Sequence, residues 1–328
     1  MTIELTSPTQ VLRFLESQGI HLKRSLGQNF LVDANYVQRI LTAADLDPSD
    51  TVIEIGPGVG VLTLQLAQRV KKVICIEVDG EMIQALRAVL AGVDNVTLVH
   101  RDVLQVDWPE LLAQQGIDRF KVVANLPYYI TTPVLTMLLE QGLPVTELVV
   151  MVQREVAQRM VASPGTKDYG AFSVFTQFYS SPRIVTIVPP TVFLPPPKVH
   201  SAVVALDVAG HRLPFAVGDP KTFFQIVRAA FGQRRKMLRR ALRGLPWREL
   251  TPEVITQWLE AANIEPTRRG ETLSLEEFAL LNRLLPRYLK TTTSKNSEAD
   301  DNDSHSLHQS RHRKSDFGPD DGEHPELH

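Results

Sequence analysis

The sequence predicts an α/β protein in which a Rossmann-like, doubly wound sheet is followed by a small all-helical domain. Between about residues 51 and 153, short apolar runs rich in β-branched residues alternate with amphipathic segments of helical length. This alternation is typical of parallel strands with helices on both faces. After about residue 208 the pattern becomes helical only. We therefore expect an α/β domain over 1–207, a helical domain over 208–290 and a disordered, polar tail over 291–328.

The predicted elements follow one another without an internal repeat. A short helix over Pro8–Gln18 ends before Gly19, a polar and basic loop follows over His21–Leu31, and Asp33 has the position of an N-cap for a helix that ends near Ala44. Strands are then predicted at Thr51–Ile55, Lys72–Glu77, Val96–His100, around Val122 and at Glu147–Gln153. Helices are predicted at Val59–Val70, Gly80–Leu90, Trp108–Gln115, Thr132–Gln141, Pro252–Ala262 and Ser274–Leu285.

Composition narrows the class of protein. The chain has 328 residues, of which 43% are hydrophobic and 22% charged, as in ordinary globular proteins. The single cysteine, Cys75, cannot form an internal disulfide and is expected to be a buried, inert thiol in a reducing compartment. Neither a signal peptide nor an apolar run of membrane-spanning length is present, so we expect a cytoplasmic protein without membrane association. Because no His/Cys group in the folded region has metal-ligand spacing, no metal is expected.

Polar groups follow four of the predicted strands. The first strand runs into the glycine-rich turn Gly56–Gly60, the second ends at Glu77, the third leads into Asp102 and the fourth ends at Asn125. The carboxyl ends of parallel strands meet at one edge of a sheet, where ligands of such folds bind. There Glu77 could accept both hydroxyls of a ribose, and Asp102 could accept the amine of an adenine.

The glycine-rich turn has two interpretations. A nicotinamide-binding Gly-x-Gly-x-x-Gly would need glycine at its sixth position, which is Val61 here, and Glu54 would repel a pyrophosphate. A cofactor that contains adenosine but no phosphate fits better. The cofactor we expect is S-adenosyl-L-methionine.

The segment Asn125–Tyr128 presents an amide, a backbone carbonyl and an aromatic ring where the fourth strand ends. The amine of adenine is a poor nucleophile because its lone pair is delocalised into the ring. Two acceptors, the Asn125 side-chain oxygen and the Leu126 carbonyl, would draw that nitrogen toward tetrahedral geometry, while Tyr128 stacks on the base. Pro127 ends the strand because it has no N–H. The segment alone could equally be a simple turn, and the other strand ends favour the catalytic interpretation.

At these positions the chain resembles the class I S-adenosylmethionine methyltransferases that dimethylate adenine in ribosomal RNA. The resemblance covers about residues 20–290 and is closest to the branch that acts on small-subunit (16S) RNA. The motifs that carry it are Gln28–Leu31, Glu54–Gly60, Glu77, Asp102, Asn125–Tyr128, Pro164–Gly170, Val188–Ser201, Phe231–Lys236 and Arg269–Phe278.

The resemblance implies an enzyme that methylates N6 of two adjacent adenines in a hairpin loop near the 3′ end of 16S rRNA during ribosome assembly. Its partner would be the rRNA of the immature small subunit, and the protein would act as a monomer. The implied cofactor-binding residues are Asn29, Leu31, Gly56, Gly58, Glu77, Asp102 and Asn125. The implied catalytic residues are Asn125, Leu126, Pro127, Tyr128 and Phe193, where Phe193 would form a second wall of the base pocket opposite Tyr128.

A basic run over Lys221–Arg248 contains nine Lys or Arg and no Asp or Glu. Such a run favours a phosphate-binding surface over a merely solvated face. The residues expected to bind RNA are Arg234, Arg235, Lys236, Arg239 and Arg243. Arg235, Arg239 and Arg243 recur every four residues and are predicted to share one helix face, and Gly232 is expected to divide the run into two helices. Elsewhere, Lys198 and His200 could contact phosphate or be only solvated.

Two other functions remain open. A large-subunit rRNA adenine dimethylase shares most of these motifs, although the segment Leu273–Phe278 favours the small-subunit branch. The protein could also be a ribosome-assembly or transcription factor that binds RNA or DNA without needing its chemistry. The intact Asn125–Tyr128 segment and the complete cofactor set favour a working enzyme.

Overall fold

The computed structural model describes residue 5, residues 7–20 and residues 27–289. Residues 21–26 of the loop expected over His21–Leu31 and the tail expected at 291–328 lie outside the described residues, and the end of that loop, Phe30–Leu31, forms a strand. Its centre is a seven-stranded sheet with the strand order β4-β3-β2-β5-β6-β9-β7. The strands are β2 (Thr51–Ile55), β3 (Lys72–Glu77), β4 (Val96–His100), β5 (Phe120–Asn125), β6 (Val145–Gln153), β7 (Ser181–Val188) and β9 (Ser201–Asp207). The predicted α/β fold is confirmed.

The sheet is mixed, which corrects the expectation of a purely parallel sheet. Strands β2 to β6 are parallel, but β9 is antiparallel to both of its neighbours, β6 and β7. The sequence analysis predicted no strand after Gln153. The segment Ser201–Asp207 nevertheless forms a strand because its apolar run is buried on both sides between β6 and β7.

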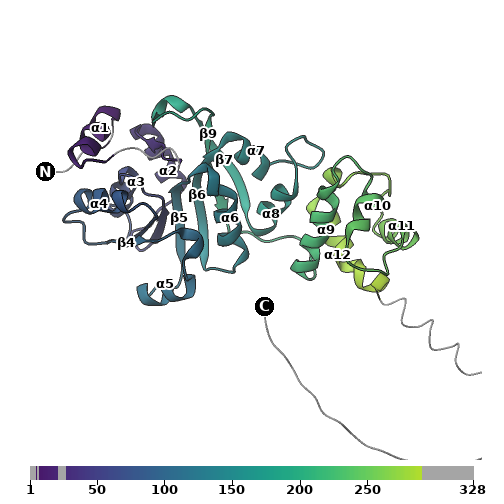
Figure 1. The fold of residues 1–328 in the computed structure, drawn as a ribbon. Coiled ribbons are helices and arrows are strands. Elements are labelled where there is room, and N and C mark those ends of the chain that lie inside the picture. The colour runs from purple at the N-terminus through teal and green to yellow at the C-terminus, as the bar shows by residue number, and fades with distance from the viewer. Residues whose placement is uncertain (1–4, 6, 21–26, 290–328) are drawn as a thin grey trace, which may run out of the picture.

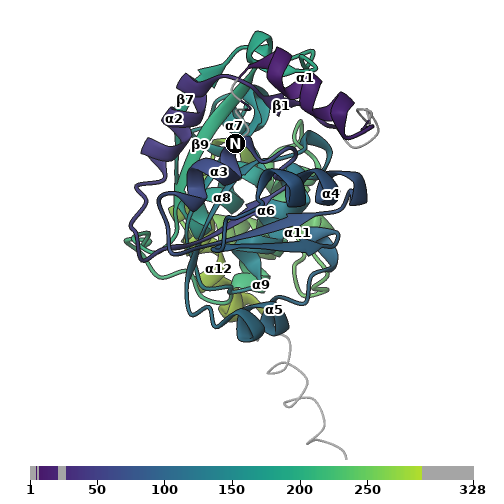
Figure 2. The ribbon, with the colours of Figure 1, turned by 90° about the vertical axis from the view of Figure 1, so that its left-hand side faces the viewer.

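Helices cover both faces of the sheet, as predicted. On one face lie α2 (Ala34–Ala43) and α3 (Val61–Ala67), which pack on alternate strand residues such as Val52 and Val73. On the other face α5 (Trp108–Gln115), α6 (Thr131–Glu140) and α7 (Arg154–Met160) pack on the intervening residues, among them Ile53 and Ile74. Figure 2 shows α2 and α3 above the strands and α5 below them.

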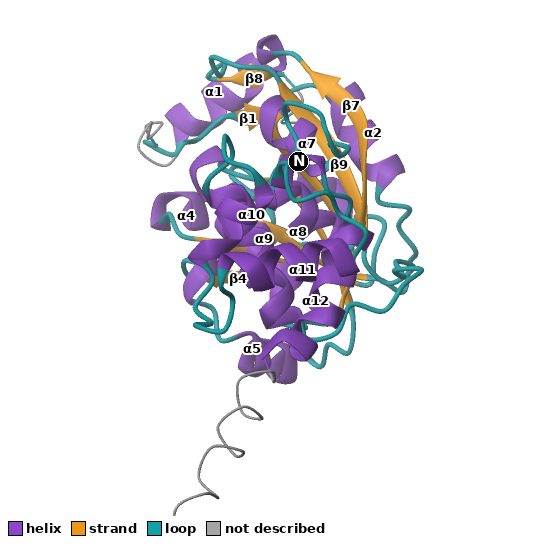
Figure 3. Ribbon diagram, turned by 90° about the vertical axis from the view of Figure 1, so that its right-hand side faces the viewer, coloured by secondary structure: helices purple, strands orange, loops and turns teal. Residues whose placement is uncertain are grey.

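The first helix and a two-stranded ribbon close one end of this domain. Helix α1 (Pro8–Ser17) packs with α4 (Gly80–Val89) in a separate apolar cluster. Beside them, β1 (Phe30–Leu31) pairs antiparallel with β8 (Phe193–Leu194) (Figure 3). This pairing joins the loop before the first sheet strand to the proline-rich loop near the end of the domain.

Four helices form the second domain, which Figure 1 shows in green and yellow beside the sheet. They are α9 (Pro220–Gly232), α10 (Leu238–Ala241), α11 (Pro252–Ala261) and α12 (Leu275–Leu289). Trp258, Phe223 and Phe278 are fully buried in their common core. The same core includes Tyr169 and Val174 from the segment around α8 (Ala171–Tyr179), so the packing of the second domain extends to residues before 207.

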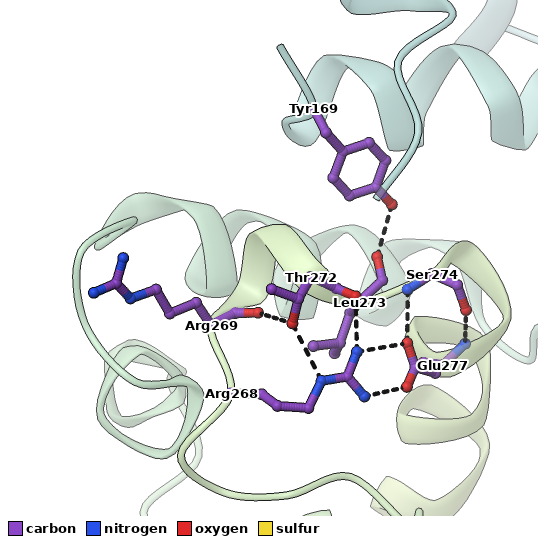
Figure 4. Close-up of polar contacts among 7 residues, drawn as sticks. All are labelled: Tyr169, Arg268, Arg269, Thr272, Leu273, Ser274 and Glu277. Carbon is purple, nitrogen blue, oxygen red and sulfur yellow. Dashed lines mark hydrogen bonds and ion pairs between the residues drawn. The ribbon is translucent and has the colours of Figure 1, made fainter. Parts of the chain in front are cut away.

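Helix α12 begins with a hydrogen-bonded cap, and Leu273 just before it bonds to the segment that precedes α8 (Figure 4). The Ser274 Oγ accepts the Glu277 N–H at 3.1 Å, and the Glu277 carboxylate accepts the Ser274 N–H at 2.8 Å, which is a capping box. The two terminal nitrogens of the Arg268 guanidinium donate hydrogen bonds to the same carboxylate. Just before this cap, the Leu273 carbonyl accepts the hydroxyl of Tyr169 at 2.9 Å.

We expect Tyr169→Phe to lower the free energy of unfolding by about 1–2 kcal/mol, because it leaves the buried Leu273 carbonyl without its donor. Urea unfolding would measure the change. Tyr288→Phe is the matched control, since its hydroxyl donates to the Gln257 carbonyl at an exposed position and should matter by less than about 0.5 kcal/mol. Equal losses of unfolding free energy in the two variants would show that the Tyr169 hydroxyl does not stabilise the fold through Leu273.

Candidate active site

The carboxyl ends of β2 to β5 surround a cavity of about 150 Å³, together with the loop before β1. The residues that line it are Gly27, Gln28, Asn29, Phe30, Ile55, Gly56, Gly58, Ile76, Glu77, Val78, Met82, Arg101, Asp102, Val103, Asn125, Leu126, Pro127, Tyr128, Tyr129 and Ile130. Of the residues predicted to bind the cofactor or take part in catalysis, Leu31 and Phe193 are the two that are not in this lining.

The orientation of the Asn125 side chain is fixed by one hydrogen bond. Its amide nitrogen donates to the backbone carbonyl of Asn29 at 2.9 Å. A carbonyl can only accept, so the amide nitrogen must face Asn29 and the amide oxygen is left to accept from another donor. The loop that carries this carbonyl is itself bonded, since the Asn29 side chain donates to the Gly27 carbonyl at 2.9 Å.

The Glu77 carboxylate is held by backbone amides. One of its oxygens accepts the N–H groups of Val78 and Asp79, both at 2.9 Å. Burial raises the pKa of Glu77, while these hydrogen bonds and one from Gly58 oppose the shift. The carboxylate is therefore rigid, and it lines the same cavity as Asp102, whose own oxygen caps the turn after β4 by accepting the Leu104 N–H at 3.0 Å.

Sequence reasoning missed Asp79, which supports the Glu77 end of the cavity. Asp79 is buried at the N-terminus of α4, where it accepts the Glu81 N–H at 3.0 Å and an amide hydrogen of Gln28 at 3.0 Å. The contact fastens the loop before β1 to the start of α4. An Asp directly before an amphipathic run is an N-cap signal that could have indicated it.

The glycine-rich turn must allow another residue to come close to its backbone. Gly58 has φ +57°, and a Cβ at this position would lie 2.6 Å from the Phe30 ring. Only glycine satisfies both the left-handed backbone and the close approach of that ring. The turn and the loop before β1 therefore pack against each other along one wall of the cavity.

The burial and charge of Glu54 differ from what the sequence predicted. Its side chain is buried beneath the turn, where it accepts the Thr63 hydroxyl at 2.6 Å and lies 3.7 Å from the Cys75 sulfur. Burial raises its pKa to about 8, so the group is mostly protonated at neutral pH. The argument that Glu54 would repel a pyrophosphate is therefore wrong. The expectation of a buried Cys75 is confirmed, and burial raises the pKa of its thiol.

Two neighbouring tyrosines lie at the mouth of the cavity with different surroundings. The hydroxyl of Tyr128 is 2.6 Å from that of Ser201 at the start of β9, and burial raises its pKa. Tyr129, which sequence reasoning did not single out, is 56% exposed and lies near Asp102 and Glu77, whose charges add to burial in raising its pKa. Tyr129 directly follows the Asn125–Tyr128 motif, which is the signal that could have drawn attention to it.

Leu31 and Phe193 lie outside the cavity lining. The two residues are register partners in the β1–β8 ribbon, and both are buried in the apolar cluster beneath α2 and α3. Phe193 is 3% exposed, and its predicted place opposite Tyr128 stays a prediction.

The basic run does not form the continuous helix face that was predicted. Helix α9 ends at Gly232, as expected, but Arg235 then lies in a turn, Arg239 in the single-turn helix α10 and Arg243 in a short 3-10 turn. The four-residue spacing of the arginines therefore does not reflect one helix. Both Arg239 and Arg243 are exposed, as are Arg235 and Lys236.

Arg234 is used within the fold. Its guanidinium forms an ion pair with Glu271 and donates to the backbone carbonyl of Lys167 at 2.6 Å. Lys167 belongs to the loop before α8, and the N–H of Gly165 in the same loop donates to the Glu271 carbonyl at 2.8 Å. The residue predicted to contact phosphate thus braces a loop against the helical domain.

Within the described ranges, no group of three or more His, Cys, Asp or Glu side chains is arranged to hold a metal ion. Nor does any helix in those ranges have the length and apolar character that crossing a bilayer requires.

The mixed sheet and the cavity at its strand ends define a class I methyltransferase fold. A family model for ribosomal RNA adenine dimethylase matches residues 19–281. The chain belongs to the ribosomal RNA adenine dimethylase family.

Relatives extend over nearly the whole described region. Ribosomal RNA small subunit methyltransferase A of Moorella thermoacetica is 48% identical over 287 residues, which cover 86% of this chain and 98% of that protein. The protein of the same name from Geobacillus kaustophilus is 46% identical over 291 residues, covering 88% and 99%.

Two solved structures are similar in fold. The structure of the 23S rRNA methyltransferase ErmE has a TM-score of 0.59 at 25% identity, covering 78% of this chain and 99% of that chain. A dimethyladenosine transferase from Plasmodium falciparum has a TM-score of 0.63 at 23% identity, covering 78% and 97%, and shows the fold alone.

The raised pKa of Glu54 predicts how stability depends on pH. The folded state holds this proton up to about pH 8, whereas the unfolded chain releases it near the ordinary value of 4.5. The folded state therefore binds more protons between these values, and this group's contribution to stability falls as pH rises through that window. We expect Glu54→Gln, which is neutral at every pH, to lose less stability than the wild type between pH 6 and pH 9, by a few kcal/mol at most.

Thermal unfolding of the two proteins across this pH range would measure the difference. Glu110→Gln, at an exposed position in α5, is the matched control and should follow the wild type. Parallel pH profiles for Glu54→Gln and the wild type would show that Glu54 is charged in the folded protein.

Proposed function

We propose that this protein transfers methyl groups from S-adenosylmethionine to N6 of two adjacent adenines in a hairpin loop near the 3′ end of small-subunit (16S) rRNA, giving dimethyladenosine during ribosome assembly. The observation that carries the proposal is the orientation of Asn125. Because its amide nitrogen is engaged by the Asn29 carbonyl, its oxygen is left as an acceptor in a cavity built for an adenosine. A hydrogen-bond acceptor at that position can bind an N–H of the adenine N6 amine, which makes the nitrogen lone pair available for methyl transfer.

The residues around the cavity fit the cofactor. S-adenosylmethionine supplies an electrophilic methyl group on a sulfonium sulfur. Glu77 would accept hydrogen bonds from the ribose hydroxyls, and Asp102 would accept one from the adenine amine. Asn29 would bind the methionine end of the cofactor, and the backbone at Gly56 and Gly58 would bind its central part. Among the described residues that line the cavity, Arg101 is the one Lys or Arg, so this part of the wall does not suit a pyrophosphate.

Catalysis then rests on orientation and on hydrogen-bond acceptors. The Asn125 oxygen and the Leu126 carbonyl accept the two N–H bonds of the target amine and draw its nitrogen toward tetrahedral geometry. Tyr128 stacks on the base, and its hydroxyl contact with Ser201 fixes the ring. The amine proton becomes acidic once the N–C bond forms, so water can accept it and no strong general base is required.

The substrate assignment follows the relatives. Those named ribosomal RNA small subunit methyltransferase A are 43–48% identical and match over almost their full length, whereas the large-subunit enzyme ErmE is 25% identical. Because the base must leave its stack to enter the cavity, a hairpin loop is a better substrate than a duplex. The complete cavity favours an enzyme over an assembly or transcription factor that does not need its chemistry.

The exposed part of the basic run is the proposed RNA-binding surface. Arg235, Lys236, Arg239 and Arg243 are all exposed beside the helical core, whereas Arg234 is engaged in its ion pair. Phosphate neutralisation by such residues gives affinity without sequence specificity. We place the protein in the cytoplasm as a monomer that acts on the immature small subunit.

Glu77→Ala should weaken binding of S-adenosylmethionine by about 1.5–3 kcal/mol, the usual value of hydrogen bonds to a charged group. Isothermal calorimetry on the folded variant would measure it, with the exposed Glu110→Ala as control. Because burial raises the pKa of Glu77, the affinity of the wild type should also fall on acidification at a higher pH than an ordinary Glu would give. Unchanged affinity in Glu77→Ala would exclude Glu77 from the cofactor site.

Asn125→Ala should slow both methylation steps by about 100-fold or more, because a monomethylated amine still needs an acceptor for its remaining N–H. Its RNA affinity should stay nearly unchanged. Single-turnover methylation of small-subunit RNA, with mono- and dimethyladenosine separated by mass, would test this. Near-normal dimethyladenosine formation would contradict the proposed mechanism.

Tyr128 offers a comparison in the same assay. Tyr128→Ala removes the ring and should lower turnover, while Tyr128→Phe keeps the stacking surface and loses only the contact with Ser201. We therefore expect Tyr128→Phe to retain much of the activity. Equal damage in both variants would show that the hydroxyl matters more than the ring.

A further inference from the structure

A second, open groove of about 600 Å³ lies beside the candidate active site and shares no lining residue with the cofactor cavity. It is formed by the end of β6 and the start of α7, by the loop before α8 and by the segment before β9. Its lining residues are Gln153, Arg154, Glu155, Gln158, Lys167, Asp168, Lys198, Val199 and His200.

The groove adjoins the place where the target base would bind. Gln153 at its edge is the register partner of Ser201, and the Ser201 hydroxyl is 2.6 Å from that of Tyr128. Across the groove, the backbone N–H of Arg154 donates to the His200 carbonyl at 2.9 Å. The groove therefore begins at the end of β6, the strand next to β5, and neighbouring strands are only about 4.8 Å apart.

The side chains of the groove suit a polyanion. Arg154, Lys167 and Lys198 are all exposed, and none of the three forms an ion pair within the part of the chain that the structure describes. Of the two carboxylates in the lining, Glu155 is paired with Arg159, which lies outside the groove. Val199 is the only apolar residue among the described residues of the lining, so this surface offers an apolar partner little area to bury.

The groove is also continuous with the helical domain. Its wall at Lys167 is held by the Arg234 hydrogen bond to the Lys167 carbonyl, and Arg234 is paired with Glu271. The next residues along the chain, Arg235 and Lys236, are exposed. Cationic side chains thus extend from the mouth of the active site, along the groove, to the exposed basic residues.

We propose that this groove binds the phosphodiester backbone of the RNA strand that flanks the target adenosine. The assignment rests on the proposed function. A base that is turned into the cavity keeps its own phosphates outside, and the groove offers Arg154, Lys167 and Lys198 to them within a short distance of Tyr128. Because phosphate contacts set register without reading sequence, these residues would position the adenosine and add to RNA affinity.

The test compares three double variants in RNA binding over a range of salt concentrations, using protein-free small-subunit rRNA. Arg154→Ala/Lys198→Ala should weaken binding roughly 25- to 60-fold at 0.1 M salt, and its log–log salt slope should fall by about 1.4–1.8, the effect of losing two phosphate contacts. Arg154→Lys/Lys198→Arg keeps the charges and should retain most of the affinity. Affinity for S-adenosylmethionine should not change in any of them.

The matched control is Arg39→Ala/Arg183→Ala, which removes two exposed cations from a different groove, between α2 and β7. It should leave affinity and slope as in the wild type. If Arg154→Ala/Lys198→Ala does the same, the groove does not bind RNA. Weaker binding to assembled subunits with unchanged binding to protein-free rRNA would assign the groove to an acidic ribosomal protein and overturn the proposal.

Failure of the groove and failure of the proposed function give different results. If the wild type forms dimethyladenosine in small-subunit rRNA while the groove variant binds that RNA normally, only the groove assignment is wrong. If the wild type forms none, the proposed reaction is wrong whatever the binding data show, and the groove assignment is lost with it.

Discussion

One hydrogen bond, from the Asn125 amide nitrogen to the Asn29 carbonyl, sets the polarity of the candidate active site. Without it the amide could turn and offer N–H donors to an amine that itself carries donors. The bond exists only if the loop before β1 lies against the end of β5. The approach of Phe30 to Gly58 and the pairing of Leu31 with Phe193 hold the loop there. Residues outside the proposed substrate contacts therefore decide which atom the Asn125 amide turns toward the cavity.

The antiparallel strand β9 contributes as much to the site as the parallel strands do. By lying between β6 and β7 it brings Ser201 to the end of β6, where the Ser201 hydroxyl meets that of Tyr128. The same strand anchors the segment that carries Lys198 and His200 along the neighbouring groove. One long-range pairing thus places the Tyr128 ring and the cationic groove in fixed relation to each other.

The sequence predicted the strand ends well because each is a local pattern, an apolar run followed by a polar residue. Glu77, Asp102 and Asn125 accordingly meet at one cavity. It failed where tertiary packing decides the outcome. Phe193 was expected in a proline-rich loop, yet it lies in a short strand that pairs with β1, and its side chain is buried in an apolar cluster. These contacts join residues far apart in the chain, and no local pattern encodes them.

The basic run over Lys221–Arg248 shows that a charge pattern in the sequence also does not identify the binding residues. The number of Lys and Arg in the run predicted a phosphate-binding surface. Charge alone, however, does not tell whether a residue binds phosphate or stabilises the fold. Arg234 is engaged by Glu271 and by the Lys167 carbonyl, so its guanidinium has already lost part of its capacity to bind phosphate. In return it fixes the loop that presents Lys167 to the groove. The proposed function therefore gives the helical domain two tasks, to bind RNA through its exposed cations and to hold Lys167 in place beside the groove.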